Sequence, residues 1–114
     1  MSNEAEKIVS FNLKPSPYKR FSEIAVSDLQ EYLRLGETTE SELSLLGTIL
    51  EAAKSYVLTY TGRSVIEADT FPEFTMAVYV LSEDMFDKRT YSIDQTNTNK
   101  VVDAILGSRS KNLL

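Results

Sequence analysis

The stretch that decides the fold is TESELSLLGTILEAAKSYVLTYTG, residues 39–62. Its apolar residues recur every three or four positions, as on one face of a helix, at Leu43, Leu46, Leu50, Ala53, Val57 and Tyr60. A second apolar stripe runs beside the first, at Leu45, Ile49, Ala52 and Tyr56. Thr39 and Glu42 form a capping box, and Gly62 suits a left-handed C-cap. The pattern predicts a long helix with an unusually wide apolar face. Gly47 in its interior predicts a close approach of another helix.

Two further helices flank this one in the sequence. Ser27 and Gln30 fit the capping box of a short helix that Gly36 would end. A longer helix is expected to begin near Thr70 or Phe71, where Thr70 and Glu73 fit a capping box with Pro72 in the first turn, and to close on Lys88 and Arg89. Its buried stripe is predicted at Phe74, Ala77, Val78, Leu81 and Met85. We expect this helix and that of residues 39–62 to pack antiparallel as the core.

The last helix is short. Thr98 or Asn99 would cap it and Gly107 would end it, with Val101, Val102, Ile105 and Leu106 on its apolar face. The polar connector at 90–98 carries Tyr91 and Ile93 in alternation, which favours one side of a short β-hairpin. The sequence therefore predicts an all-α fold, a small bundle of about four helices.

Residues 1–25 differ from the rest. Pro15 and Pro17 favour extended geometry. Exposing several apolar residues of this segment to water is costly, which favours an anchored arm over a disordered leader. Among them are Phe11, Tyr18, Phe21 and Ile24. We therefore divide the chain into an N-terminal arm at 1–25, a helical domain at 26–107 and a basic tail at 108–114.

Composition excludes much chemistry. The 114 residues contain no Cys and no His, so thiolate nucleophiles, disulfides and the commonest general base are absent. Seventeen acids against twelve bases give a net charge of −5, which disfavours broad binding to a phosphate backbone. No apolar run approaches the roughly 20 residues of a membrane span. We expect no cofactor, no metal and no membrane partner, and no enzymatic activity.

Two charged clusters are candidate sites. Glu83, Asp84 and Asp87 lie close together, and we interpret them as a solvated helix face; a carboxylate-dependent metal enzyme is a remote alternative. The basic residues near the two ends of the chain are interpreted as exposed charges and not as a sequence-reading surface. Arg89 is the basic residue most expected to have a structural partner.

The apolar surface exceeds what a small bundle can hide. Either the arm folds back on its own core, or neighbouring subunits cover the surplus. If neighbouring subunits cover the surplus, the candidate subunit or partner interface comprises Phe11, Tyr18, Arg20, Phe21, Arg89, Tyr91, Ile93, Arg109, Lys111, Leu113 and Leu114.

Four strings, in order, resemble the small helical head–tail connector (DNA-packaging adaptor) family of long-tailed bacteriophages. They are VSDLQEYL at 26–33, ILEAAKSYVLTYTGR at 49–63, the segment from Pro72 through MAVYVL to FDKR at 72–89, and VVDAIL at 101–106 followed by Arg109. Two features depart from the family pattern. Ser108 stands where an aromatic residue often precedes the final arginine, and the N-terminal arm is longer than expected.

The resemblance implies a structural role at the head–tail interface of a virion, after assembly in the bacterial cytoplasm. Family members form rings, expected to be twelve-fold, on the portal protein. They extend the channel through which DNA passes and receive a stopper or tail-completion protein. A ring needs two different surfaces on each subunit, where surplus apolar area would be buried. The alternative is a small helical prophage protein with an interaction or regulatory role that binds a single protein partner.

Overall fold

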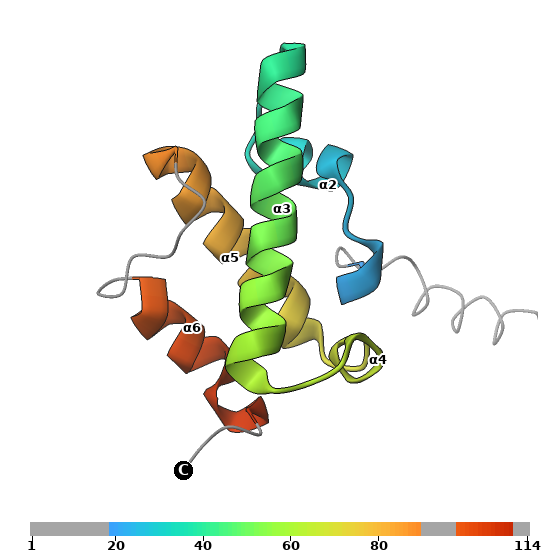
Figure 1. Ribbon diagram of the computed structural model, residues 1–114, viewed down its shortest axis with the longest axis vertical. Coiled ribbons are helices and arrows are strands. Elements are labelled where there is room, and N and C mark those ends of the chain that lie inside the picture. Colours follow the sequence, from blue (N-terminus) through green and yellow to red (C-terminus); the bar gives the residue numbers. More distant parts are fainter. Residues whose placement is uncertain (1–18, 90–97, 111–114) are drawn as a thin grey trace, which may run out of the picture.

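The computed structural model describes residues 19–89 and 98–110, and every regular element within them is helical. The elements are η1 (Phe21–Glu23), α2 (Val26–Tyr32), α3 (Glu40–Thr61), α4 (Val65–Ala68), α5 (Pro72–Lys88), α6 (Thr98–Leu106) and η2 (Gly107–Arg109) (Figure 1). The all-α prediction is confirmed. The expected hairpin falls at residues outside the described ranges, apart from Thr98, which is the first residue of α6.

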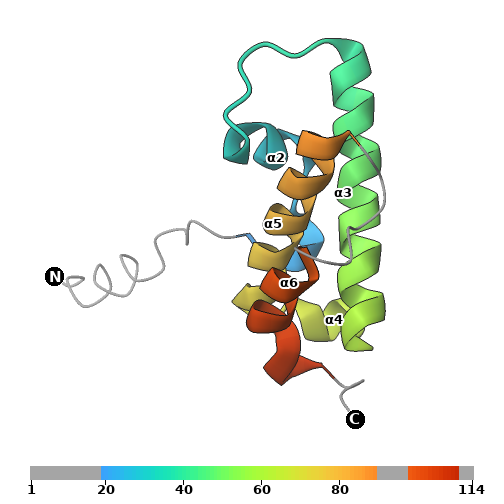
Figure 2. The ribbon, with the colours of Figure 1, turned by 90° about the vertical axis from the view of Figure 1, so that its left-hand side faces the viewer.

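The core lies between α3 and α5, which run side by side in opposite directions as predicted (Figure 2). Helix α2 and η1 close one flank of this pair, and α6 packs on α5 from the other. All five residues of the stripe predicted on α5 are buried. Helix α3 buries Leu46, Ile49, Leu50, Ala53, Val57 and Thr61. Two members of its predicted stripe lie outside this set, because Leu43 in the first turn is 37% exposed and Tyr60 is half-buried.

Both predicted caps of α3 are confirmed. The Thr39 hydroxyl accepts from the Glu42 N–H at 3.1 Å, and the Glu42 carboxylate accepts from the Thr39 N–H at 3.1 Å. Gly62 has φ 71°, in the left-handed region, and its N–H donates to the Leu58 carbonyl at 2.8 Å. These caps satisfy backbone groups that the helix itself leaves without partners.

The expected ends of α2 are wrong at both termini. The helix begins one residue before Ser27, because the Asp28 carboxylate accepts from the Ala25 N–H at 2.8 Å and so makes Ala25 the N-cap. A charged acceptor makes a stronger bond at this position than a hydroxyl. The helix ends at Tyr32, and Arg34, with φ 58°, takes the left-handed conformation expected of Gly36.

The start of α5 also differs from the expected capping box. Phe71 is the N-cap and makes no side-chain cap bond, while Pro72 occupies the first turn. The Thr70 hydroxyl donates instead to the Glu67 carbonyl at 2.7 Å. The C-terminal end falls at Lys88 as predicted, and Arg89 follows with φ 51°.

Gly47 does not mark a forced helix contact. A Cβ atom built there would meet only the Val26 Cγ2 atom within 4 Å, at 3.9 Å, which is an ordinary van der Waals distance. The prediction of a close approach that requires glycine is therefore wrong.

The described root of the arm belongs to the core. Phe21 and Ile24 are 2% and 3% exposed, and the Phe21 ring meets that of Phe74 edge-on with centroids 6.4 Å apart. Here the arm folds back on its own core, which was the alternative to an interface. The packed core therefore begins at Phe21, before the predicted domain start at residue 26.

Candidate assembly surfaces

The most exposed large apolar side chain in the described part of the chain lies on α4. The Ser64 hydroxyl accepts from the Glu67 N–H at 3.2 Å, and the Glu67 carboxylate accepts from the Ser64 N–H at 3.0 Å. This single turn buries Ala68 and leaves Val65 and Ile66 42% and 79% exposed. This turn was not predicted from the sequence, although Ser64 and Glu67 have capping-box spacing.

Two arginines lie over the same aromatic ring, where the C-terminal segment meets α5. The Arg109 guanidinium donates two hydrogen bonds to one oxygen of Glu73, both at 3.2 Å. Its central carbon lies 4.3 Å from the centroid of the Phe71 ring, and that of Arg63 lies 5.4 Å from the same centroid. The Arg63 Nε–H also donates to the Arg109 carbonyl at 2.7 Å. We call Arg63, Phe71, Glu73 and Arg109 the arginine cluster.

The arginine cluster fixes the point from which the chain continues beyond residue 110. The Ser110 hydroxyl donates to the Tyr60 carbonyl at 3.3 Å, near the C-terminal end of α3. Arg109, predicted as an interface residue, thus has partners inside its own domain, while its side chain remains 40% exposed. The cluster attaches η2 to the N-terminal turn of α5.

Replacing Arg109 with alanine should lower the free energy of unfolding by about 1 kcal/mol. A half-exposed ion pair and a cation–π contact each contribute at most about this amount. Urea titration of wild type and Arg109→Ala measures the change. Lys100→Ala, which removes an exposed cation from α6, serves as the control. If the two variants unfold at the same urea concentration, the arginine cluster does not stabilise the fold.

A tyrosine attaches α6 to α3. The Tyr60 hydroxyl donates to the Asp103 carboxylate. This hydrogen bond, together with burial and the charge of Asp103, raises the pKa of Tyr60 to about 12. The neutral phenol is the donor, so the contact requires the protonated form.

The stabilising effect of the Tyr60 contact should depend on pH. The folded-state pKa is raised above the unfolded value of 10.0. The contribution is therefore complete below pH 10 and is lost as pH rises through 12. Urea unfolding of wild type and Tyr60→Phe at a series of pH values should show a difference that shrinks across this window. A difference that stays constant to pH 12 contradicts the assignment.

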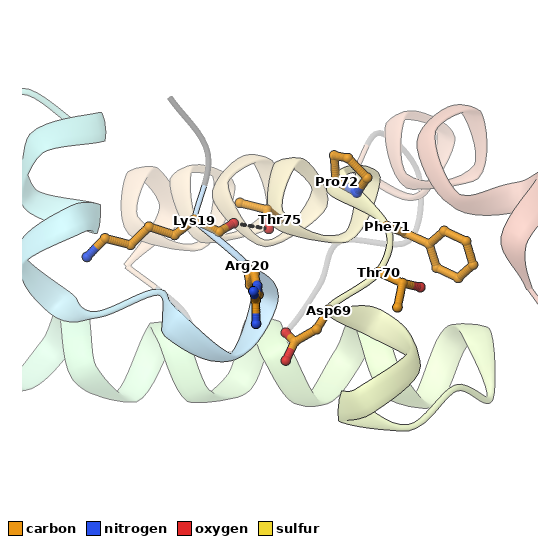
Figure 3. A pocket seen from close by; sticks show the side chains of 7 residues that line it. All are labelled: Lys19, Arg20, Asp69, Thr70, Phe71, Pro72 and Thr75. Carbon is orange, nitrogen blue, oxygen red and sulfur yellow. Dashed lines mark hydrogen bonds between the residues drawn. The ribbon is translucent and has the colours of Figure 1, made fainter. Parts of the chain in front are cut away.

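A shallow cavity lies at the root of the arm, between η1 and the start of α5 (Figure 3). Its volume is about 160 Å³, and its lining comprises Lys19, Arg20, Asp69, Thr70, Phe71, Pro72 and Thr75. The Asp69 carboxylate accepts from the N–H and the hydroxyl of Ser22, both at 2.8 Å. The carboxylate of Asp69 thus already has structural partners in η1.

Of the predicted interface residues, the structure describes Arg20, Phe21, Arg89 and Arg109, and these four do not form one surface. Arg20 lies at the arm root, Arg109 at one end of α5 and Arg89 at the other, where its guanidinium carbon is 4.2 Å from the centroid of the Phe86 ring. Phe21 is a core residue and not a surface residue, because it packs against Phe74. The remaining candidates lie outside the described residues: Phe11, Tyr18, Tyr91, Ile93, Lys111, Leu113 and Leu114.

Within residues 19–89 and 98–110, no three or more acidic side chains gather so as to hold a metal ion. In the same ranges, no helix combines the length and hydropathy that crossing a bilayer requires.

The sequence profile of the phage gp6-like head-tail connector proteins matches residues 23–107, most of the chain. The chain belongs to this connector family. The matched segment runs from the last residue of η1 to the first residue of η2, so it includes Ile24 and the bundle but not Phe21. Neither a curated protein nor a solved structure shows a significant match. The resemblance drawn from the four sequence strings is thus confirmed at the level of the connector family.

Proposed function

We propose that this connector-family chain assembles as a ring on the portal protein, expected to be twelve-fold. The ring would extend the DNA channel between head and tail and receive a stopper or tail-completion protein. Its role would be structural, in the virion, after assembly in the host cytoplasm. The observation that carries the proposal is the family match over residues 23–107.

The placement of exposed apolar side chains supports a ring. Leu43 is exposed in the first turn of α3, and Val65 and Ile66 are exposed just beyond its last turn. The axis of α3 rises about 27 Å from Leu43 to its last residue, Thr61, at 1.5 Å per residue, so the two sites lie at opposite ends of the helix. A closed ring needs two different surfaces on each subunit, and separate apolar sites at opposite ends of one helix meet that need.

The distribution of charge suits a channel that conducts DNA. Seven acids and one base, Arg34, lie between Glu23 and Glu51. Most of these acids are exposed on α2, the α2–α3 loop and α3. An acidic surface repels phosphates and would keep DNA from binding to the channel wall.

Binding to the portal protein of the same phage tests the proposal. The full chain is mixed with assembled portal, and native mass spectrometry counts the bound copies. Many copies on each portal support the ring. A single copy would favour the alternative, a protein with one partner, and the absence of binding would contradict both.

A further inference from the structure

One side of α5 is exposed although part of it is apolar. Pro72, Met76, Tyr79 and Glu83 follow one another at intervals of four, three and four residues, so they share one side of the helix. The buried stripe, from Phe74 to Met85, lies on the other side. Met76 is 36% exposed, Pro72 and Glu83 are exposed, and Tyr79 is half-buried. We call these four residues the outer face of α5.

The outer face continues onto neighbouring elements at both ends. At one end, the Tyr32 ring of α2 stacks on Tyr79 with centroids 4.7 Å apart, and its hydroxyl donates to Glu83 at 3.3 Å. Tyr32 is itself 39% exposed. At the other end, Pro72 is shared with the cavity of about 160 Å³ at the arm root (Figure 3). A partly apolar surface therefore runs from that cavity to α2.

The described chain begins on the flank of this surface. The Thr75 hydroxyl donates to the Lys19 carbonyl at 2.7 Å, and the Lys19 ammonium pairs with Asp28 at 3.1 Å. Figure 3 shows the Lys19 carbonyl directed at Thr75 and its side chain extending away from the cavity. These contacts fix residue 19 against α5. The 18 residues that precede it are therefore attached at the edge of the outer face.

The chemistry of those preceding residues matches the surface. Between residues 7 and 18 the only charges are Lys7 and Lys14, and the large apolar residues there are Ile8, Val9, Phe11, Leu13 and Tyr18. The surface carries Glu83, and Glu31 and Asp28 of α2 lie near Tyr79, with Asp28 already paired to Lys19. Burial, with the charges of Asp28 and Glu31, raises the pKa of Tyr79. A segment that is basic and apolar thus begins beside a surface that is acidic and apolar.

We propose that residues 11–18 of the chain's own arm lie along the outer face of α5 and cover Met76. Length permits this, since eight extended residues span up to about 26 Å, whereas α5 rises only about 16 Å from Pro72 to Glu83. Tethering favours the chain's own arm over a second copy, because a short linker gives an effective concentration in the millimolar range. We call the exposed Val65 and Ile66 the apolar corner of α4. The docked arm would leave this corner free for subunit contacts.

Paired cysteines test the proposal, and the chain contains no native cysteine to interfere. Ser16→Cys is combined with Met76→Cys, and the control combines Ser16→Cys with Ile66→Cys. Ile66 is more exposed than Met76, and its helix contacts η1, so the control is also near the arm root. Under mild oxidation of micromolar protein, the intramolecular disulfide in the Met76 pair should form about tenfold faster than in the control pair. Non-reducing electrophoresis and peptide mass spectrometry measure both rates.

Two outcomes would overturn the proposal: equal rates for the two pairs, or covalent dimers as the main product, which would place the arm on a second copy. A measurement that leaves α5 unaltered guards against a packing effect of Met76→Cys. A nitroxide on Ser16→Cys alone should broaden the amide signals of Met76 and Tyr79 more than those of α4. Equal broadening at the two helices contradicts docking, whether or not a ring forms on the portal.

Discussion

Replacing Ile66 with aspartate is expected to weaken binding to the portal by about 100-fold or more while leaving the fold intact. Ile66 is 79% exposed, so its removal costs the isolated domain little. At the centre of a subunit contact, the same substitution would bury an unpaired charge and lower the binding free energy by about 3 kcal/mol. A loss of that size weakens binding by about 100-fold or more. Portal pull-down measures binding, and thermal melting verifies the fold.

Ser55→Asp is the matched control for Ile66→Asp. It adds the same charge at an exposed position on α3, away from the apolar corner of α4. The control should bind the portal like wild type. If Ile66→Asp also binds like wild type, the α4 corner is not a subunit contact.

Replacing Phe21 with alanine should destabilise the domain by about 3–5 kcal/mol, the usual cost of removing a buried phenylalanine. The ring is 2% exposed and lies edge-on to Phe74 in the core. Urea unfolding monitored by circular dichroism measures the loss. The result would show that the arm root belongs to the folded domain.

Ser27→Ala serves as the control for Phe21→Ala. Ser27 is exposed and does not cap α2, so its replacement should change stability by at most about 0.5 kcal/mol. A change below about 1 kcal/mol in Phe21→Ala would contradict the placement of this ring in the core.

The long helices could be predicted because their signals are local. The apolar stripe of α5 and the caps of α3 depend on residues within a few turns of one another. The same reasoning failed at the N-terminal end of α2, where two residues compete to fix the start of the helix. Ser27 fits a cap by type, but the Asp28 carboxylate bonds to the N–H of Ala25 and fixes an earlier start.

The arginine cluster could not be predicted, because its contacts join distant parts of the chain. Arg109 meets Glu73 across 36 positions of sequence, and Arg63 reaches the Arg109 carbonyl across 46. Phe21 presented a related ambiguity. A large apolar residue near a chain end suits an interface or a core equally well, and only its packing against Phe74 decides for the core.

Electron microscopy of the full chain bound to its phage portal would show directly whether a ring forms. We expect a closed ring of chains around the portal channel, with each copy contacting its neighbour through two different surfaces. A portal that carries isolated single copies, or none, would contradict this expectation.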